Sequence, residues 1–402
     1  MSGRHPIFDG HNDALLRLWK SGANPLQSFV AGGSGHIDLP KARKGGLIGG
    51  FFAIFVPGSL KFDLTALQSE SYDIPLPGEL NEAEALKAVM EQAAILLVLE
   101  AEGALRICKS LADIRTSMAD GILAAVLHME GAEAIGPDLA ALEVLHAAGL
   151  RSIGPVWSRE TNIGTGVPIR YPSDGDIGPG LTDDGKRLVR RVADLKMVLD
   201  LSHLNEKGFW DVADMGVPLV ATHSNAHALT PLSRNLTDRQ LAAIGESGGL
   251  VGLNYATAFL RPDGQMRSEG ALEWMPRHLA HMVGIAGEDH VALGSDFDGG
   301  VMPREIGDVG GLDALRDAMT SAGFTDDLIE KICWKNWMAG LERIWGTAPI
   351  RGLITRPRGG DAPLPSGPKG SKKGGKRRPS PESRKRLQGT LLSCSIYSTD
   401  PN

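Results

Sequence analysis

The chain has 402 residues, of which 42% are hydrophobic, 22% are charged and 5% are aromatic. A chain of this size can bury a large core, and one α/β barrel of roughly 250 to 400 residues fits as well as two domains. The formal net charge of -6 is unevenly distributed, because residues 351–386 contain twelve Lys or Arg and only two acidic residues. The body of the chain is therefore acidic, and its C-terminal part is basic.

Cysteine content and hydropathy exclude several classes of protein. The three cysteines, Cys108, Cys333 and Cys394, are too few and too scattered for a disulfide framework, and they lack metal-site spacing. No apolar leader precedes the first predicted strand, and no apolar run is long enough to cross a bilayer. We therefore expect a cytoplasmic protein without a membrane partner.

Apolar runs typical of strands alternate with helical patterns along the chain. The first predicted strand and its exit cover residues 7–13, and the other seven predicted strands are residues 47–56, 122–128, 151–157, 197–202, 217–222, 250–255 and 291–295. The predicted helices are residues 81–100, 110–120, 139–148, 183–195, 206–215, 238–246, 272–283, 312–321 and 326–344, with a long loop at 158–180. This alternation requires a parallel sheet, and eight strands in one run favour a closed (β/α)8 TIM barrel. A doubly wound sheet would need a glycine-rich phosphate turn after the first strand, which residues 9–12 lack.

The apolar pattern ends at Gly346, so we place the barrel domain at residues 1–346 and a separate tail at residues 347–402. Residues 351–386 are rich in Gly, Pro, Ser, Lys and Arg and cannot offset their ordering entropy by burial, which predicts disorder. Basic tails can bind nucleic acid, but no aromatic residues interleave with these charges. We therefore expect no nucleic-acid partner. Salt-dependent DNA affinity that disappears on truncation after Gly346 would contradict this expectation.

The first strand leads into the motif His11-Asn12-Asp13. In extended backbone, side chains two residues apart point to the same side, so His11 and Asp13 can reach one point together. Imidazole and carboxylate suit zinc or another first-row divalent ion. We expect Gly10, just before them, to let the backbone turn at the end of the strand.

Four further reactive side chains follow other predicted strands: Glu130, His203, His223 and Asp296. In a (β/α)8 barrel all these positions lie on the C-terminal rim, where active sites of this fold are found. Each residue taken singly has an ordinary explanation, such as helix capping or a hydrogen-bonded histidine at a strand end. Together they exceed the three protein ligands of a catalytic zinc site, which favours two metals bridged by Glu130. We expect His128 to lie below the metals as a hydrogen-bonded core histidine.

Six segments strengthen this interpretation when they are taken together. They are residues 9–13 (DGHND), 129–131 (MEG), 200–203 (DLSH), 222–225 (THSN), 233–236 (SRNL) and 294–299 (GSDFDG). In this order and spacing they resemble the membrane dipeptidase family, also called renal dipeptidase or peptidase family M19, within the metal-dependent amidohydrolase-like barrels. The resemblance covers residues 7–345.

The resemblance implies two Zn²⁺ per chain and a dipeptide substrate. It implies His11 and Asp13 as ligands of one ion, His203 and His223 as ligands of the other, and Glu130 as the bridge. We expect a water between the ions, whose pKa falls from about 15.7 towards 7, to attack the peptide bond as a metal-bridging hydroxide. The ligand set and the attacking group together predict a metallo-dipeptidase.

The resemblance also assigns the two ends of the substrate. Arg234 is expected to hold the terminal carboxylate, which matches the bidentate fork of a guanidinium. Asp296 is expected to face the substrate amine and to transfer the proton during turnover. A free carboxylate close to the scissile bond would then be required, so longer peptides should be poor substrates.

One position departs from the family pattern. The family carries a histidine that contacts the substrate carbonyl at the end of the fourth strand, where this chain has Trp157. An indole can donate one hydrogen bond but has no exchangeable charge, so this contact is either replaced or lost. Arg159 and Asn162 are candidate replacements.

Two rival functions stay open at this point. The first is another amidohydrolase, such as a deacylase of N-acyl amino acids, although Asp296 would find no cation in an acylated substrate. The second is a metal-bound binding protein that lost catalysis with Trp157. Assembly into a homodimer is also left open.

Overall fold

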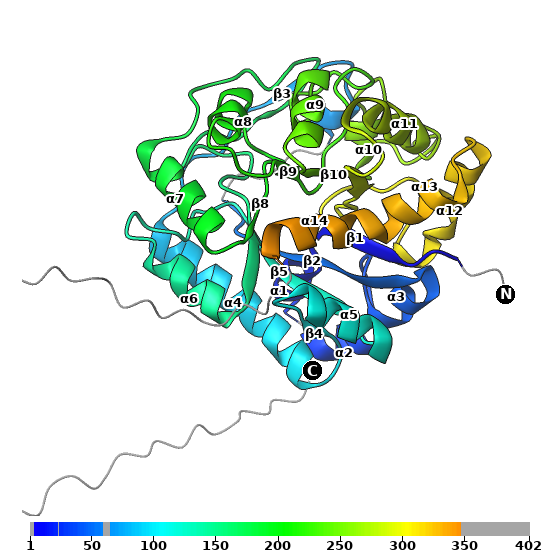
Figure 1. The fold of residues 1–402 in the computed structure, drawn as a ribbon, viewed down its shortest axis with the longest axis horizontal. Helices are drawn as coiled ribbons and strands as arrows, with labels where there is room; N and C mark the ends of the chain where they lie inside the picture. Colours follow the sequence, from blue (N-terminus) through cyan, green and yellow to red (C-terminus); the bar gives the residue numbers. More distant parts are fainter. Residues whose placement is uncertain (1–3, 23, 59–64, 347–402) are drawn as a thin grey trace, which may run out of the picture. The chain divides into compact units, whose positions relative to one another are not determined.

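The computed structural model describes residues 4–22, 24–58 and 65–346, so the predicted tail lies outside the described residues. Parallel strands form a ring with helices around it (Figure 1). One sheet has the order β1 (Ile7–Asn12), β2 (Leu47–Phe55), β5 (Ala124–Glu130), β6 (Leu150–Ile153) and β8 (Val198–Leu199). The other contains β9 (Val220–Ala221), β10 (Leu250–Leu253) and β11 (Val291–Leu293). Parallel bridges between Asp200 and Val220 and between Asn12 and Phe297 join the two sheets. The predicted (β/α)8 barrel is confirmed.

Helices surround the ring, and side chains cap the N-terminus of several of them. The helices are α1 (Ala14–Lys20), α2 (Pro25–Val30), α3 (Leu39–Gly45), α4 (Glu82–Ala101), α5 (Leu111–Asp120), α6 (Ala140–Ala148), α7 (Asp183–Asp194), α8 (Glu206–Ala213), α9 (Asp238–Glu246), α10 (Thr257–Leu260), α11 (Trp274–Ala286), α12 (Asp313–Ser321), α13 (Asp326–Glu330) and α14 (Asn336–Trp345). Thr237, for example, forms a capping box with Gln240 at the start of α9. A π-helical segment, Lys331–Lys335, connects α13 to α14, so the single helix predicted at 326–344 is interrupted.

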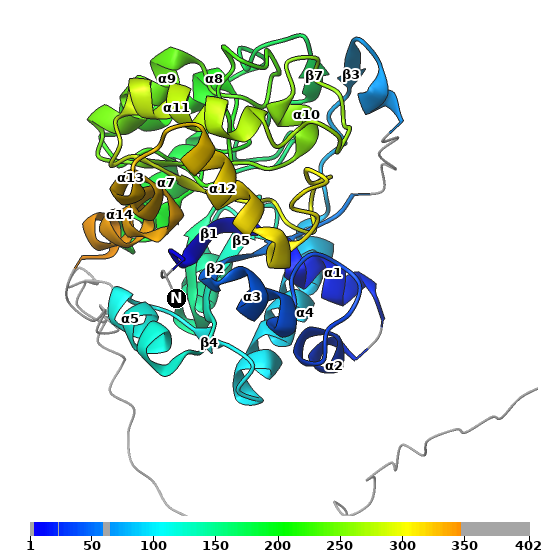
Figure 2. The same ribbon diagram turned by 90° about the vertical axis from the view of Figure 1, so that its right-hand side faces the viewer.

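The loop predicted at residues 158–180 contains a strand. β7 (Ile169–Tyr171) pairs antiparallel with β3 (Tyr72–Ile74), and Figure 2 shows the two side by side. Their apolar side chains pack in a small cluster with Phe259 and other residues near α10. A third short strand outside the ring, β4 (Arg106–Ile107), pairs with β5. The β3–β7 pairing joins segments far apart in sequence, which periodicity alone does not reveal.

Apolar side chains fill the half of the barrel opposite the C-terminal rim. The helix α14 packs against this half (Figure 1). Trp337 of α14 reaches into it, packs on Phe51 at a ring separation of 4.9 Å and donates a hydrogen bond to the Leu293 carbonyl. A Cβ on Gly10 would lie 2.5 Å from the Trp337 ring and 2.5 Å from the Thr222 carbonyl oxygen. The expectation that Gly10 allows a turn is wrong, because β1 continues to Asn12 and the glycine instead permits close packing.

Among the described residues, no helix is both long enough and apolar enough to span a bilayer.

Candidate metal centre and active site

Five predicted side chains meet at the C-terminal rim of the barrel, and all are buried. Oε1 of Glu130 lies 2.9 Å from Nε2 of His203, 3.4 Å from Nε2 of His223 and 3.7 Å from Nε2 of His11. Nε2 of His11 lies 3.6 Å from Oδ2 of Asp13. Two groups of three potential ligands share Glu130, one with His11 and Asp13 and one with His203 and His223. The arrangement offers two adjoining cation sites.

The positions of these residues relative to the strand ends differ from the prediction. Glu130 is the last residue of β5 and His11 lies inside β1, whereas both were expected after their strands. β8 ends at Leu199 and β9 at Ala221, so His203 and His223 lie on irregular backbone beyond shorter strands than predicted. The rim loops, rather than the strands, therefore set the final positions of both histidines.

The electrostatics of the cluster suit a cation. Both ring nitrogens of His11 are buried without a hydrogen-bond partner. Burial lowers the pKa of His11, but the nearby carboxylates of Glu130 and Asp13 outweigh burial and raise it to about 10. Burial raises the pKa of Glu130 well above its ordinary value. A divalent cation would satisfy the unpaired imidazole and neutralise the carboxylates, so these residues fit a metal.

Hydroxyl groups engage the second nitrogen of two histidines. Oγ of Ser158 lies 3.0 Å from Nδ1 of His203, and Oγ1 of Thr222 lies 2.8 Å from Nδ1 of His223. Contacts of this kind orient histidines that bind metals. Sequence reasoning missed both hydroxyls, although Thr222 directly precedes His223 in a motif that it had singled out. His128 was expected below the centre, and it lies there with Nδ1 2.8 Å from Oγ of Ser152.

A cavity of about 470 Å³ opens above this cluster. Its polar lining includes Asp13, Glu130, His203 and Asp296. Most of its wall is apolar, formed by Leu16, Phe55, Leu67, Trp157, Ile169, Ala256, Ala258, Phe259, Met266 and Val301. The cavity thus combines a polar floor with walls that can hold apolar groups.

Asp296 is held rigidly beside the cluster. Its backbone has a left-handed φ of 60°, and its N–H donates to the His11 carbonyl at 3.0 Å. Nδ2 of Asn254 donates to Oδ2 of Asp296 at 2.9 Å, and Oδ1 of Asn254 accepts from the Ala256 N–H, which fixes the orientation of the amide. Burial, reinforced by the charge of Asp13, raises the pKa of Asp296 to about 6. Asn254 carried no signal in the sequence.

Arg234 lies behind the cavity wall rather than in it. Its guanidinium donates to Oγ of Ser224 at 2.7 Å and to the His223 carbonyl at 2.8 Å, while Nε is buried without a partner. Burial lowers its pKa to about 10. The guanidinium carbon lies 5.9 Å from the ring centre of Phe259, which does line the cavity. The unpartnered Nε–H group of Arg234 therefore lies behind a residue of the cavity wall.

Trp157 lies in the cavity wall. Arg159 and Asn162, the two candidates for the contact of the expected histidine, do not line the cavity. The ring of Trp157 packs against Phe55 at 4.9 Å and lies 5.8 Å from the His203 ring. Arg159 is fully buried, where it donates to Oε1 of Glu133 at 2.7 Å, and Asn162 is exposed. Neither side chain lines the cavity, so neither stands in for the family histidine there.

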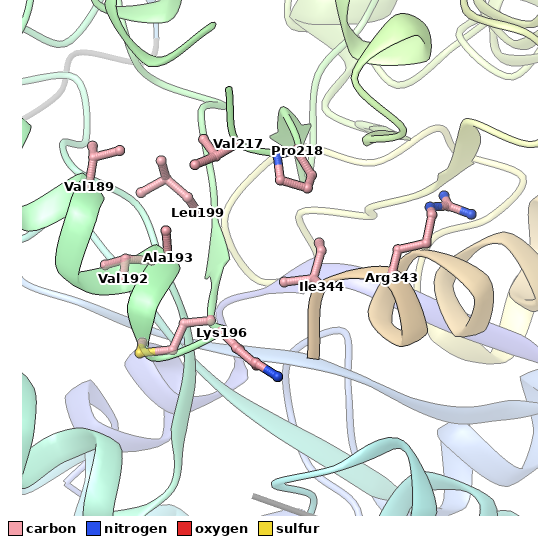
Figure 3. A pocket seen from close by; sticks show the side chains of 10 residues that line it. Val189, Val192, Ala193, Lys196, Leu199, Val217, Pro218, Arg343 and Ile344 are labelled. Carbon is pink, nitrogen blue, oxygen red and sulfur yellow. The ribbon is translucent and has the colours of Figure 1, made fainter. Parts of the chain in front are cut away.

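A second cavity, of about 120 Å³, lies near the starts of β8 and β9 (Figure 3). Val189, Leu199 and Ile344 are among its apolar lining residues, and Lys196 and Arg343 are its charged ones. Since it holds none of the rim residues, we assign it no role in catalysis.

A closed eight-stranded α/β barrel with histidines and carboxylates gathered at the C-terminal rim defines a metal-dependent hydrolase of the amidohydrolase-like type. The model of the membrane dipeptidase family (peptidase family M19) matches residues 1–348, and the chain belongs to that family. It is therefore an enzyme, a metallo-dipeptidase, as the sequence predicted.

Similar proteins agree with this assignment. A metallopeptidase from Rhodobacter sphaeroides, solved with a phosphinate mimic of the dipeptide L-Ala-D-Ala, is 51% identical, with a TM-score of 0.84 over 85% of this chain and 100% of its own. An uncharacterized protein of Klebsiella pneumoniae is 48% identical over 258 residues, 63% of this chain and 95% of its own. An amidohydrolase from Pseudomonas aeruginosa, 20% identical with a TM-score of 0.66 over 85% of this chain and 97% of its own, shares the fold.

Proposed function

We propose that this metallo-dipeptidase uses two zinc ions, held by His11 and Asp13 on one side and by His203 and His223 on the other, with Glu130 between them. The observation that carries the proposal is the single carboxylate oxygen of Glu130, which lies within 3.7 Å of three histidine nitrogens. When bound, the ions would activate a water and polarise the scissile carbonyl. Two carboxylates and three imidazoles, one of them buried without a hydrogen-bond partner, are a donor set that zinc suits.

The chain's own residues would orient the dipeptide and move the proton. Asp296 lines the cavity with a pKa near 6, so it can take a proton from the attacking water and pass it to the leaving amine near neutral pH. The unpaired Nε of Arg234 supports a role in binding the terminal carboxylate. The apolar walls exclude water and accept apolar side chains. The ligand of the Rhodobacter sphaeroides relative supports a D residue in the second position.

Metal analysis followed by a dipeptide screen tests the proposal. The purified enzyme should contain two zinc ions per chain and should cleave L-Ala-D-Ala. Ala-Ala-Ala should be a poor substrate, because a third residue moves the carboxylate away from Arg234. Equal cleavage of the tripeptide would contradict the assigned substrate ends, and one metal ion per chain would contradict the shared centre. Cleavage of N-acetylalanine in preference to Ala-Ala would favour the deacylase instead.

A further inference from the structure

Asp200, directly after β8, is a buried carboxylate that is saturated with hydrogen bonds. Its Oδ1 accepts from the Ser202 N–H at 3.1 Å, the Ser202 hydroxyl at 2.6 Å and the Thr222 N–H at 2.8 Å. Its Oδ2 accepts from the Thr222 hydroxyl at 2.6 Å. These donors replace the water that Asp200, 3% exposed, has lost. The carboxylate is therefore held ionised in one orientation.

The same two hydroxyls also contact His223. Oγ of Ser202 accepts from the His223 backbone N–H at 3.1 Å, and Oγ1 of Thr222 lies 2.8 Å from Nδ1 of the ring. A hydroxyl has one proton, and Thr222 donates its proton to Asp200. Towards His223 the Thr222 oxygen can therefore only accept. Nδ1 must carry the ring proton, which leaves the lone pair on Nε2, 3.4 Å from Oε1 of Glu130.

We infer that Asp200, acting through the hydroxyls of Thr222 and Ser202, fixes His223 in the tautomer that can bind a metal through Nε2. The inference rests on the proposed function, because it concerns the same site. Asp200 and Thr222 are positioning residues in this arrangement. Partners that hold the second nitrogen of a ligating histidine generally contribute about 10- to 100-fold to metal affinity.

Asp200 must also be considered as a metal ligand, since it lies near His11 and His223. Its position argues against that role. Oδ2 lies 3.8 Å from Nδ1 of His223, on the side of the ring away from Glu130, and both oxygens already accept strong hydrogen bonds. Asp200 therefore lies on the Nδ1 side of the His223 imidazole, opposite the nitrogen that would bind the metal.

The relay, by which we mean the contact from Asp200 through the Thr222 hydroxyl to Nδ1 of His223, is tested by Thr222→Val. Valine has nearly the shape of threonine and lacks the hydroxyl. Zinc affinity of the metal-free enzyme, measured by competition with a chelating dye, should fall about 10- to 100-fold. Thr222→Ser retains the hydroxyl and should bind zinc like the wild type. Thr257→Val is the matched control, because Thr257 is fully buried and its hydroxyl has no hydrogen-bond partner.

A second measurement needs no metal. In metal-free protein labelled with ¹⁵N-histidine, long-range proton–nitrogen NMR should show His223 protonated at Nδ1, and this preference should be lost in Thr222→Val. Wild-type affinity in Thr222→Val, an equal loss in Thr222→Ser, or protonation at Nε2 in the wild type would each overturn the inference. If the wild type shows the Nδ1 proton but binds no zinc, the relay stands and the proposed zinc centre fails.

Discussion

At the scale of single residues, the neighbours of Asp296 determine what its carboxyl group can do. Asn254 donates to Oδ2, which favours Oδ1 as the oxygen that carries a proton of this carboxyl group. A Cβ on Gly299 would lie 2.3 Å from Oδ1 of Asp296 and 2.2 Å from Oδ2 of Asp13, so Oδ1 is on the side of the proposed ligands. The carboxyl group of Asp296 is thus arranged to exchange its proton on the side of the proposed metal centre rather than on the side of Asn254.

Asp296→Asn should therefore impair proton transfer while leaving the metal ligands in place. We expect kcat on Ala-Ala to fall about 10²- to 10⁴-fold, because an amide cannot act as a general acid or base. Zinc content, measured on the same sample, should equal that of the wild type. A kcat within tenfold of wild type would show that another group moves the proton.

Trp157 lies in the cavity wall, and this position predicts a role in substrate selection. Trp157→Ala should lower kcat/KM for Leu-Leu by about tenfold, the typical effect of losing one apolar contact surface. Ala-Ala is the internal control, since its methyl groups reach less of the wall. An equal loss for both substrates would instead indicate that Trp157 acts on the reaction step.

At the scale of elements, β1 depends on close backbone packing inside the barrel. Gly10, Gly252 and Gly294 all face the Thr222 carbonyl oxygen, and a Cβ on any of them would lie within 2.5 Å of it. Contacts this short leave no room for a side chain, which ties the spacing of three strands to the segment that carries His223.

Gly10→Ala should therefore destabilise the enzyme by about 1–3 kcal/mol, because a methyl group there overlaps the Thr222 carbonyl and Trp337. Gly284→Ala in α11 is the control, since a Cβ there meets nothing within 4 Å. It should stabilise by about 0.5–1 kcal/mol through its helix propensity. Thermal midpoints measured by circular dichroism check both, and a Gly10→Ala midpoint equal to wild type would contradict the packing argument.

α11 is joined to the rim by a neutral histidine. Nδ1 of His278 accepts from the Ala226 N–H at 3.1 Å, and its Nε2 donates to the Leu260 carbonyl at 2.9 Å. Burial lowers the pKa of His278 from 6.5 to about 4. The unfolded chain therefore takes up this proton first as the pH falls, so the stability from His278 is fully present above pH 6.5 and is lost progressively towards pH 4.

Urea unfolding of the metal-free enzyme at about pH 7 and about pH 5 should detect this loss, which amounts to about 2 kcal/mol. His278→Gln cannot titrate and should lose correspondingly less stability over the same interval. The same acid loss in both proteins would mean that His278 is not the group responsible.

At the scale of the whole molecule, the rim cluster couples metal binding to folding. Its carboxylates are brought close together in a buried setting, which costs free energy unless a cation neutralises them. Zinc at about 1,000 times its dissociation constant should stabilise the enzyme by about 4 kcal/mol. Thermal midpoints should therefore rise when zinc is added back to chelator-treated protein, and no such rise should occur in Glu130→Gln. A midpoint independent of zinc would contradict the proposed centre.

Much of the architecture could be read from local patterns. Each predicted strand of the barrel is present, because a buried parallel strand needs a continuous apolar run and each run lies between helical patterns. The lengths of β8, β9 and β11 were overestimated, since pairing ends where the rim loops turn away. The β3–β7 ribbon was missed because β5, β6 and the helices next to them separate its two strands in the sequence.

For the candidate site too, the sequence indicated one part and the tertiary structure decided another. Sequence alone indicated which side chains lie near the carboxyl ends of barrel strands, and parallel strands end on one rim, so His11, Glu130, His203 and His223 were expected together. Only the tertiary structure decided which groups contact them, namely the hydroxyls of Ser158 and Thr222. The physical reason is that a hydrogen bond depends on ångström-scale distances between atoms of separate segments, and the spacing of residues along the chain does not encode these distances.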